Sequence, residues 1–326
     1  MKVCIVGAGA IGGFIGTRLA AAGQAQVSAI ARGATLAALR EHGWRMDTAQ
    51  GRITAPVRAS DRAADLGEQD LVVIAVKGPA LTAVAQDIAP LLGPGTRVLP
   101  AMNGVPWWFC QGLPGFEAPL QSVDPGGAIA RAIAAESVIG CVVHAATSTS
   151  APGLVQHKMG DGLIIGEPRG GTSERVQALA QLLTYAGFNV TNSADVRNDI
   201  WYKLWGNLTM NPVSAITGAT IDRVLADPLV RNFCHAAMQE AAAIGERIGC
   251  AISQSAEERS VLTAKLGAFK TSMLQDVEAG RAIELDAIVG AVHEIGGRLG
   301  MPMPNINALL GLTRLFGRVH GLYPEA

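Results

Sequence analysis

Several patterns typical of secreted and metal-binding proteins are missing from this chain of 326 residues. Its five cysteines are scattered and include no CxxC pair, which argues against a disulfide framework and against a zinc site. The six histidines show neither HExxH nor another metal-ligand spacing. We therefore expect buried thiols and no bound metal. The cysteines are Cys4, Cys110, Cys141, Cys234 and Cys250.

Charge and long apolar runs are also scarce. Only 16% of the residues are charged, and the formal net charge is -1, with no dense cluster of lysine and arginine. That balance argues against nucleic acid as a partner. No apolar run reaches the roughly 20 residues that span a bilayer. Five glycines between Gly7 and Gly16 interrupt a stretch that otherwise resembles a secretory signal. We expect a cytoplasmic protein without a membrane partner.

Glycine and apolar residues, by contrast, are abundant. The chain has 39 glycines and is 49% hydrophobic, which is enough apolar material for a packed core. Its length exceeds the roughly 100 to 200 residues of one domain, so we expect two domains with a ligand cleft between them. No GxSxG motif is present, which argues against a serine hydrolase of the α/β type.

The first hundred residues alternate short β-rich runs with helical periodicity. A strand, helix, strand unit of about 30 residues implies parallel strands with a right-handed crossover. The order continues with a fully apolar run that is typical of a buried parallel strand. We predict an α/β fold with a doubly wound sheet. The predicted strands are residues 2–6, 27–31, 70–76 and 96–100, and the predicted helices are 11–22 and 79–92.

The remainder of the chain divides near residue 194. Runs at residues 137–144, 153–157 and 162–165 are predicted to extend the same sheet, followed by a helix at 173–186 and a short extended run at 189–191. After Asp195 strand signals stop, and an all-α region follows, with predicted helix breaks at Pro212, Gly218, Asp227-Pro228, Gly249, Gly280 and Pro302. We predict a dinucleotide-binding domain at 1–194 and a helical substrate domain at 195–326.

A glycine-rich turn follows the first predicted strand. The run Gly7-Ala8-Gly9-Ala10-Ile11-Gly12 is a GxGxxG placed between a strand and a helix, the context that identifies a Rossmann-type nucleotide site. Gly7 permits the sharp turn, Gly9 lets a pyrophosphate approach the backbone, and Gly12 allows close helix packing. The helix N-terminus offers amide donors to that anion. The alternative is a purely structural glycine turn.

Polar residues at the ends of the other strands extend this site, because ligands of open α/β sheets lie beyond the carboxyl ends of the strands. Arg32 ends the second strand, with no acidic residue until Glu41, which favours the 2'-phosphate of NADPH over NADH. Lys77 and Asn103 follow the next two strands in the same way. A solvated side chain is the alternative at each position.

A polar stripe marks the start of the helical region. Lys203, Asn207 and Asn211 are spaced i, i+4 and i+8, which places them on one face of a helix among apolar neighbours. Buried amides and ammonium groups need partners, so the stripe indicates a ligand or, alternatively, an internal hydrogen-bond network. Further along, Glu284 is predicted to lie in the first turn of another helix, where a carboxylate is favourable and can meet a lysine.

Together these motifs resemble the ketopantoate reductase (2-dehydropantoate 2-reductase) family over nearly the whole chain, including the run from Ser272 to Asp276. The resemblance implies that Lys203 is the general acid and that Glu284 orients it. It implies that Asn207, Asn211 and Ser272 bind substrate, and that Asn103 and Lys77 contact cofactor and substrate. In that family a hydride passes from NADPH to ketopantoate, giving pantoate for pantothenate synthesis.

Two alternatives remain open from the sequence. One is a reductase of the same fold that acts on a different 2-oxo acid or an alcohol. The insertion-like segment after Asn103, which contains Trp107-Trp108, could alter which acid is accepted. The other is a non-catalytic NADPH-binding regulator, whose expected sign is loss of Lys203 or Glu284, and both are present. A homodimer formed through the apolar C-terminal helices is a further hypothesis.

Overall fold

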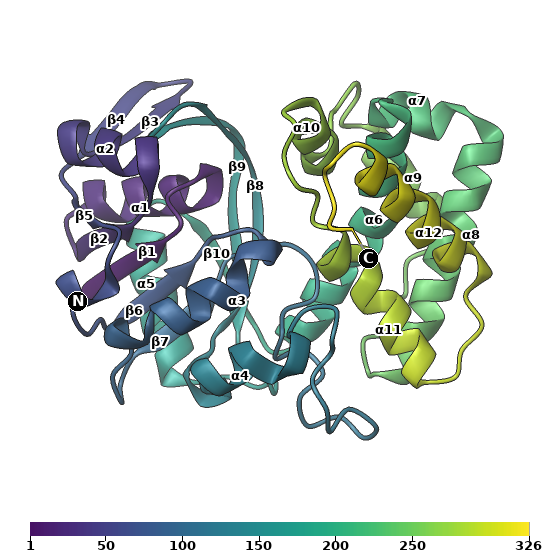
Figure 1. Ribbon diagram of the computed structural model, residues 1–326, viewed down its shortest axis with the longest axis horizontal. Helices are drawn as coiled ribbons and strands as arrows, with labels where there is room; N and C mark the ends of the chain where they lie inside the picture. Colours follow the sequence, from purple (N-terminus) through teal and green to yellow (C-terminus); the bar gives the residue numbers. More distant parts are fainter. Residues whose placement is uncertain (326) are drawn as a thin grey trace. The chain divides into compact units, whose positions relative to one another are not determined.

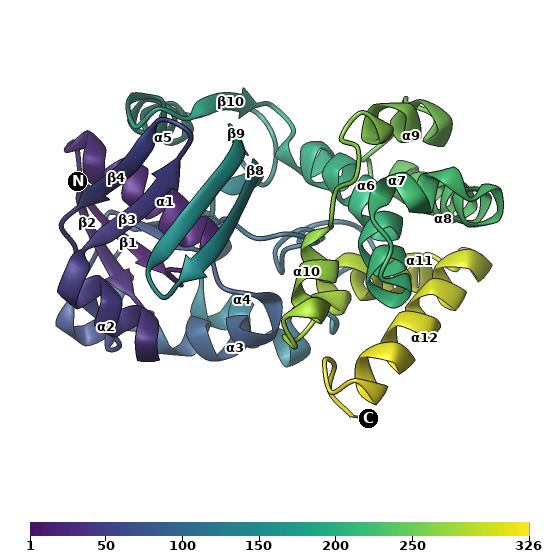
Figure 2. The same cartoon turned by 90° about the horizontal axis from the view of Figure 1, so that it is seen from above.

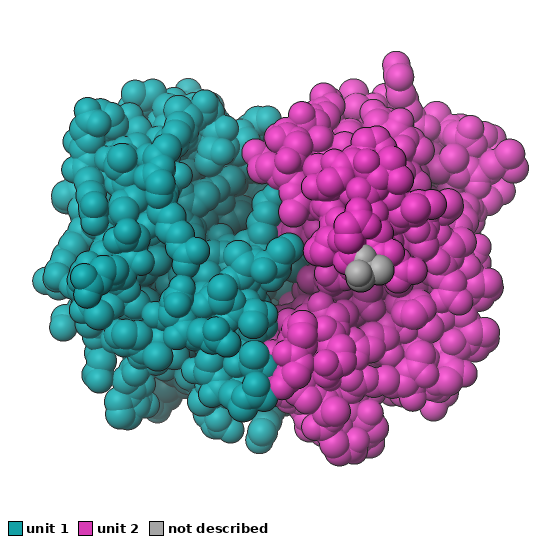
Figure 3. Space-filling model, viewed as in Figure 1, with its two compact units in different colours: residues 1–103, 128–199 teal, residues 104–127, 200–326 magenta. Residues whose placement is uncertain are grey.

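A computed structural model of the protein describes residues 1–325 and divides them into two compact units. Unit 1 comprises Met1–Asn103 and Ala128–Asp199, and unit 2 comprises Gly104–Gly127 and the chain from Ile200 onward (Figure 3). The predicted division at 194/195 therefore needs correction. The chain crosses between the units within a helix, and residues 104–127 belong to the second unit because their buried aromatic side chains pack there: Phe109 stacks on Trp201.

Unit 1 contains the predicted parallel sheet. Its strand order is β5 (Arg58–Ser60), β2 (Gln26–Ile30), β1 (Lys2–Val6), β6 (Leu71–Ile74) and β7 (Arg97–Pro100), with every pair parallel. All four residues of β6 are buried, as expected for a central strand covered on both faces. The predicted Rossmann-type first domain is confirmed.

Helices separate several strands of unit 1 along the chain. They are α1 (Ala10–Ala22), α2 (Gly33–His42), α3 (Gly78–Asp87) and, later in the chain, α4 (Ala128–Ala132) and α5 (Glu174–Tyr185). Helix α3 is shorter than predicted, because Pro90 lies in a separate 3-10 turn, Ala89–Leu91, and proline cannot supply the amide that would continue an α-helix.

A second sheet makes up the rest of unit 1. Its order is β10 (Asn189–Ser193), β9 (Leu154–Gly166), β3 (Trp44–Thr48) and β4 (Gly51–Ala55), with β8 (Gly140–Ala151) antiparallel to β9 (Figure 2). The prediction that the runs after residue 137 extend the first sheet was wrong. Apart from one bridge between Val138 and Val98 of β7, these runs form β8 and β9, and β9 pairs with β3, a strand that the sequence analysis missed.

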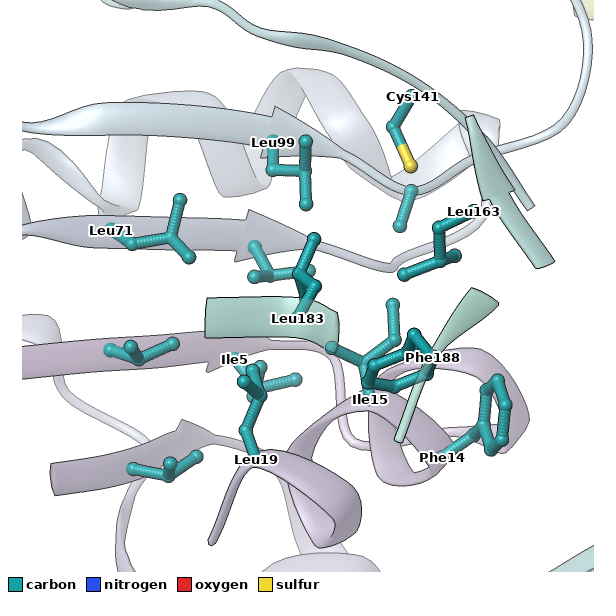
Figure 4. Packing of buried hydrophobic residues seen from close by; sticks show 14 of the residues in the cluster. Ile5, Phe14, Ile15, Leu19, Leu71, Leu99, Cys141, Leu163, Leu183 and Phe188 are labelled. Carbon is teal, nitrogen blue, oxygen red and sulfur yellow. The ribbon is translucent and has the colours of Figure 1, made fainter. Parts of the chain in front are cut away.

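Helix α1 contacts strands of both sheets. A Cβ atom on Gly13 would lie 2.5 Å from Val155, and one on Gly16 would lie 2.6 Å from Trp44. Glycine at these positions lets the helix approach the second sheet closely. The opposite side of α1 fills the core of unit 1, where Ile15 and Leu19 lie beside Ile5 (Figure 4). The helix that begins at the glycine turn is therefore fixed from two sides.

Among its described residues, unit 2 contains helices and loops but no strand, in agreement with the predicted all-α region (Figure 1). Its long first helix, α6 (Val196–Thr217), contains Pro212, so the predicted break there was wrong. Met210 and Val213 beside the proline are buried in one apolar cluster, and this packing offsets the single lost hydrogen bond. The other helices are α7 (Ile221–Ala226), α8 (Pro228–Arg247), α9 (Ala256–Ala264), α10 (Ser272–Glu278), α11 (Ala291–Arg298) and α12 (Pro304–Val319), with a π-helical turn, Asp286–Gly290, before α11.

All five cysteines are buried, in agreement with the expectation of buried thiols. Burial raises the pKa of the Cys4 and Cys234 thiols to about 11. Both therefore remain protonated at neutral pH. None of the helices in residues 1–325 combines the length and the apolar character that a bilayer crossing requires.

Candidate active site

The glycine turn after β1 has the geometry that its sequence predicts. Gly7 has φ +94°, and a Cβ atom there would lie 2.7 Å from Val76 and 2.9 Å from the carbonyl oxygen of Ala75. Its amide donates a hydrogen bond to the carbonyl oxygen of Ile30, at 3.0 Å. Backbone conformation and space both require glycine at this position.

The other two glycines of the motif differ sharply from each other. A Cβ atom on Gly12 would lie 1.9 Å from the carbonyl oxygen of Gly7, so glycine is needed for close packing of α1 on the turn. A Cβ atom on Gly9 would have no neighbour within 4 Å. Gly9 is the N-cap of α1 and makes no side-chain cap. The space beside it, at the positive end of a helix, suits the pyrophosphate of a dinucleotide.

The remaining residues of the motif surround that space. Ala8 is buried, whereas Ala10 and Ile11 form the half-buried first turn of α1. The amides of this turn are the donors that a helix N-terminus leaves without partners within the helix.

Arg32 lies at the end of β2, at the N-cap of α2. Its guanidinium forms an ion pair with the carboxylate of Asp87 at 3.0 Å, and both side chains are about two-thirds exposed, at 67% and 65%. An exposed guanidinium that already binds one anion can exchange it for a phosphate, because surface ion pairs of this kind contribute little stability.

Lys77 and Asn103 follow the two remaining strands. Lys77 is half-buried at the N-cap of α3, and its ammonium nitrogen is inaccessible to solvent. Asn103 is half-buried three residues after β7. Since the four strands are parallel neighbours, the glycine turn, Arg32, Lys77 and Asn103 all lie at the carboxyl edge of one sheet. The structure thus brings together every predicted cofactor residue.

In unit 2, α6 carries the predicted polar stripe. Lys203 and Asn207 are half-buried and Asn211 is buried. Because the helix is continuous across all three positions, they lie on one face. The adjoining faces are apolar, with buried Trp201, Leu204, Trp205 and Leu208.

Two hydroxyl groups connect this stripe to α10. The hydroxyl of Ser214 donates to the carbonyl oxygen of Asn211 at 3.0 Å and lies 2.5 Å from the hydroxyl of Thr271. Thr271 caps α10, accepting a hydrogen bond from the amide of Leu274. Ser272, the first residue of α10, is exposed. The structure therefore places the start of α10 next to the turn of α6 that carries Asn211.

Glu284 is half-buried and immediately precedes the helical segment that begins at Leu285. The sequence placed it within the first turn, one residue too far into the helix. Sequence analysis also missed what surrounds it. Asp286 opens the π-helical turn and accepts a hydrogen bond from the hydroxyl of Tyr323 at 2.5 Å. The only sequence signal for this contact was an acidic residue two positions after Glu284 and a tyrosine near the end of the chain.

Two family models and a curated relative agree on the family of this chain. The family described as Ketopantoate reductase PanE/ApbA matches residues 3–170, and Ketopantoate reductase PanE/ApbA C terminal matches residues 195–316. The 2-dehydropantoate 2-reductase of Mesorhizobium japonicum is 45% identical over 325 residues, 99% of this chain and 100% of that protein.

Solved structures extend this similarity. A crystal structure assigned as a ketopantoate reductase of Ralstonia solanacearum MolK2 is 54% identical, with a TM-score of 0.93, and covers 98% of this chain and 99% of that one. A dimeric ketopantoate reductase from Staphylococcus aureus, at 18% identity and a TM-score of 0.75, covers 98% of this chain and 100% of that one. At that identity it shares the fold alone.

Proposed function

This chain belongs to the ketopantoate reductase family, and we propose that it reduces 2-dehydropantoate (ketopantoate) to pantoate with NADPH as the reductant. The protein is an oxidoreductase, and its family uses a nicotinamide cofactor. The product serves pantothenate synthesis, as the name of the reaction implies. The choice of NADPH and the roles of individual residues are the parts that we add.

The glycine turn holds the cofactor pyrophosphate against the N-terminus of α1. Gly9 carries this assignment, because the space beside it is open and the first amides of α1 face it without a side-chain cap. Arg32 binds the 2'-phosphate, and its exposed ion pair with Asp87 supports this role because the guanidinium is accessible to an anion. Lys77 and Asn103 contact the cofactor at the same sheet edge, and Asn103 also contacts the substrate.

The stripe on α6 handles the substrate. Asn207 and Asn211 donate hydrogen bonds to its hydroxyl and carboxylate groups, together with Ser272 at the start of α10. These groups suit an acid with a hydroxyl, since amides and hydroxyls both donate to carboxylate oxygens. An apolar acid would leave part of the stripe without partners, at a cost of about 1–3 kcal/mol for each buried group.

Proton transfer falls to Lys203. When bound, the nicotinamide cofactor would supply a hydride to the C2 carbonyl carbon, and the carbonyl oxygen would then carry negative charge. The Lys203 ammonium stabilises that charge and then donates its proton to the oxygen, giving the hydroxyl of pantoate. Glu284 orients the ammonium toward the oxygen.

The observation that carries this proposal is that one chain contains both an uncapped, glycine-lined helix N-terminus, in unit 1, and a lysine–asparagine stripe on a helix of unit 2. NADPH oxidation over a panel of 2-oxo acids tests it. We expect the highest kcat/KM with ketopantoate and a lower value with NADH. A different 2-oxo acid with a higher kcat/KM would replace the substrate, and preference for NADH would refute the role of Arg32.

We further propose that the protein forms a homodimer. Three exposed apolar side chains along α12, Leu312, Leu315 and Val319, provide a surface that a second copy would cover. The mass in solution checks this directly, and a monomer at micromolar concentration would contradict it. A location in the cytoplasm stays a prediction.

A further inference from the structure

We infer that Tyr323, close to the end of the chain, is a positioning residue for Glu284 and acts through Asp286. This inference rests on the proposed function, because it gives Glu284 a task in the reaction. It assigns a role in the site to the segment after α12, which contains none of the motifs and no residue of the substrate stripe.

Two hydrogen bonds join this segment to residues on either side of Glu284. The amide of Ile283 donates to the carbonyl oxygen of Leu322 at 3.0 Å, and the hydroxyl of Tyr323 donates to the Asp286 carboxylate at 2.5 Å. One bond fixes the residue before Glu284 and the other fixes the residue two positions after it. The backbone that carries Glu284 is therefore held from both sides by consecutive residues of the tail.

The tail reaches this position because the chain turns back beside α12 (Figure 2). The amides of Leu322 and Tyr323 both donate to the carbonyl oxygen of Gly317, at 2.7 and 3.2 Å. A Cβ atom on Gly317 would lie 2.7 Å from the Cβ atom of Tyr323 and 3.2 Å from the side chain of Ile283. Glycine at 317 thus lets the tail and the Glu284 segment approach the same turn of α12.

The π-helical turn after Glu284 makes the third attachment. Within it, the amide of Ala291 bonds to the carbonyl oxygen of Asp286 rather than that of Ala287. The oxygen of Ala287 is left to accept a hydrogen bond from the amide of Val105 at 2.8 Å. Single π turns of this kind are often found at functional sites. Here the turn fastens the segment to residues 104–127 of the same unit.

Charge and burial agree with a specific pairing. Burial raises the pKa of Asp286, while the Tyr323 hydrogen bond opposes that rise. Burial, and then the bond to Asp286, raise the pKa of Tyr323 to about 12. The hydroxyl therefore stays protonated and able to donate throughout the neutral range. Without it, a half-buried carboxylate would lose its donor, and the segment would have reason to rearrange.

The test is Tyr323→Phe, which keeps the ring and removes the hydroxyl. We expect kcat to fall roughly tenfold, within the range that slight misplacement of a catalytic group costs. The dissociation constant for NADPH, which unit 1 binds, should not change. Tyr185→Phe is the matched control, because Tyr185 is an exposed tyrosine of α5, and it should retain wild-type kcat.

A double-mutant cycle with Glu284→Gln separates positioning from general stability. If Tyr323 acts through Glu284, the double variant should have the same kcat as Glu284→Gln alone. A further tenfold loss in the double variant would overturn this inference and leave the role of Glu284 intact. Wild-type kcat in Glu284→Gln would overturn the role of Glu284, and this inference with it.

A second variant tests the same hydrogen bond in case Tyr323→Phe does not fold. Asp286→Ala removes the acceptor instead of the donor and keeps the tail hydroxyl. It should lower kcat by a similar factor and be equally silent in the Glu284→Gln background. Circular dichroism at the assay temperature selects the variants that are folded. Wild-type kcat in either folded variant would overturn the inference.

Discussion

The substitution Gly9→Ala isolates the phosphate cradle from the stability of the fold. Gly9 has φ -80° and ψ -154°, a conformation open to alanine, and its added Cβ atom would have no neighbour within 4 Å. The protein without ligand should therefore accept the methyl group. Any effect on the cofactor must come from the space that the methyl group takes beside the first turn of α1.

The size of that effect follows from the amides it would obstruct. A hydrogen bond to a charged group contributes about 1.5–3 kcal/mol, so losing one bond to the pyrophosphate and weakening a second costs roughly 2–4 kcal/mol. At 1.4 kcal/mol for each factor of ten, NADPH affinity should fall about 30- to 1,000-fold. Folding stability should change by less than about 1 kcal/mol, since alanine is a poorer N-cap but restricts the unfolded chain.

Titration of NADPH by calorimetry and a thermal melt without ligand measure the two quantities separately. Gly12→Ala provides the contrast, because its Cβ atom would lie 1.9 Å from the carbonyl oxygen of Gly7. Backbone must move there, so we expect a loss of stability of about 1–3 kcal/mol. Wild-type NADPH affinity in Gly9→Ala would refute the assignment of the cradle.

Three further predictions concern catalysis, cofactor choice and pH. Lys203→Ala should lower kcat by about 10²–10⁴-fold, the range for a lost general acid. The dissociation constant for NADPH should not change. Robust turnover by this variant would contradict the role of Lys203. Arg32→Gln should weaken NADPH binding about tenfold or more and leave NADH binding unaffected. Asp87→Asn should strengthen NADPH binding slightly, because it removes the competing anion. Fluorescence titration of both variants with each cofactor measures these affinities. Hydrogen bonds from Arg175 hold the pKa of Glu167 below its ordinary 4.5, so the pair stabilises the fold above pH 4.5 and that contribution is lost as pH falls through the lowered pKa. Urea unfolding of Glu167→Gln should accordingly differ most from wild type at neutral pH, and a difference that stays constant down to acid pH would contradict the sign.

The parts of the fold with strong local signals were predictable from the sequence. The glycine turn, the apolar run of β6 and the change to helices after Asp195 all have patterns that one segment carries by itself. The second sheet has no such signal. Trp44 starts β3 in a run with charged Arg45 and Asp47, and the pairing of this strand with β9 is a long-range choice.

The candidate site divides in the same way. The spacing of Lys203, Asn207 and Asn211 fixed their common face once the helix was continuous, although Pro212 suggested an earlier end. The surroundings of Glu284 depend on contacts with the tail, which spacing along the chain does not encode. A π turn in particular arises from packing, and it left no pattern in residues 286–290 to detect.

The central claim is that the Lys203 ammonium delivers the proton to the substrate carbonyl. A crystal structure with NADPH and a non-reducible analogue of ketopantoate measures this directly. We expect the Lys203 Nζ within hydrogen-bond distance, about 2.7–3.2 Å, of the oxygen that becomes the hydroxyl. An ammonium directed to solvent, with another donor on that oxygen, would contradict the account.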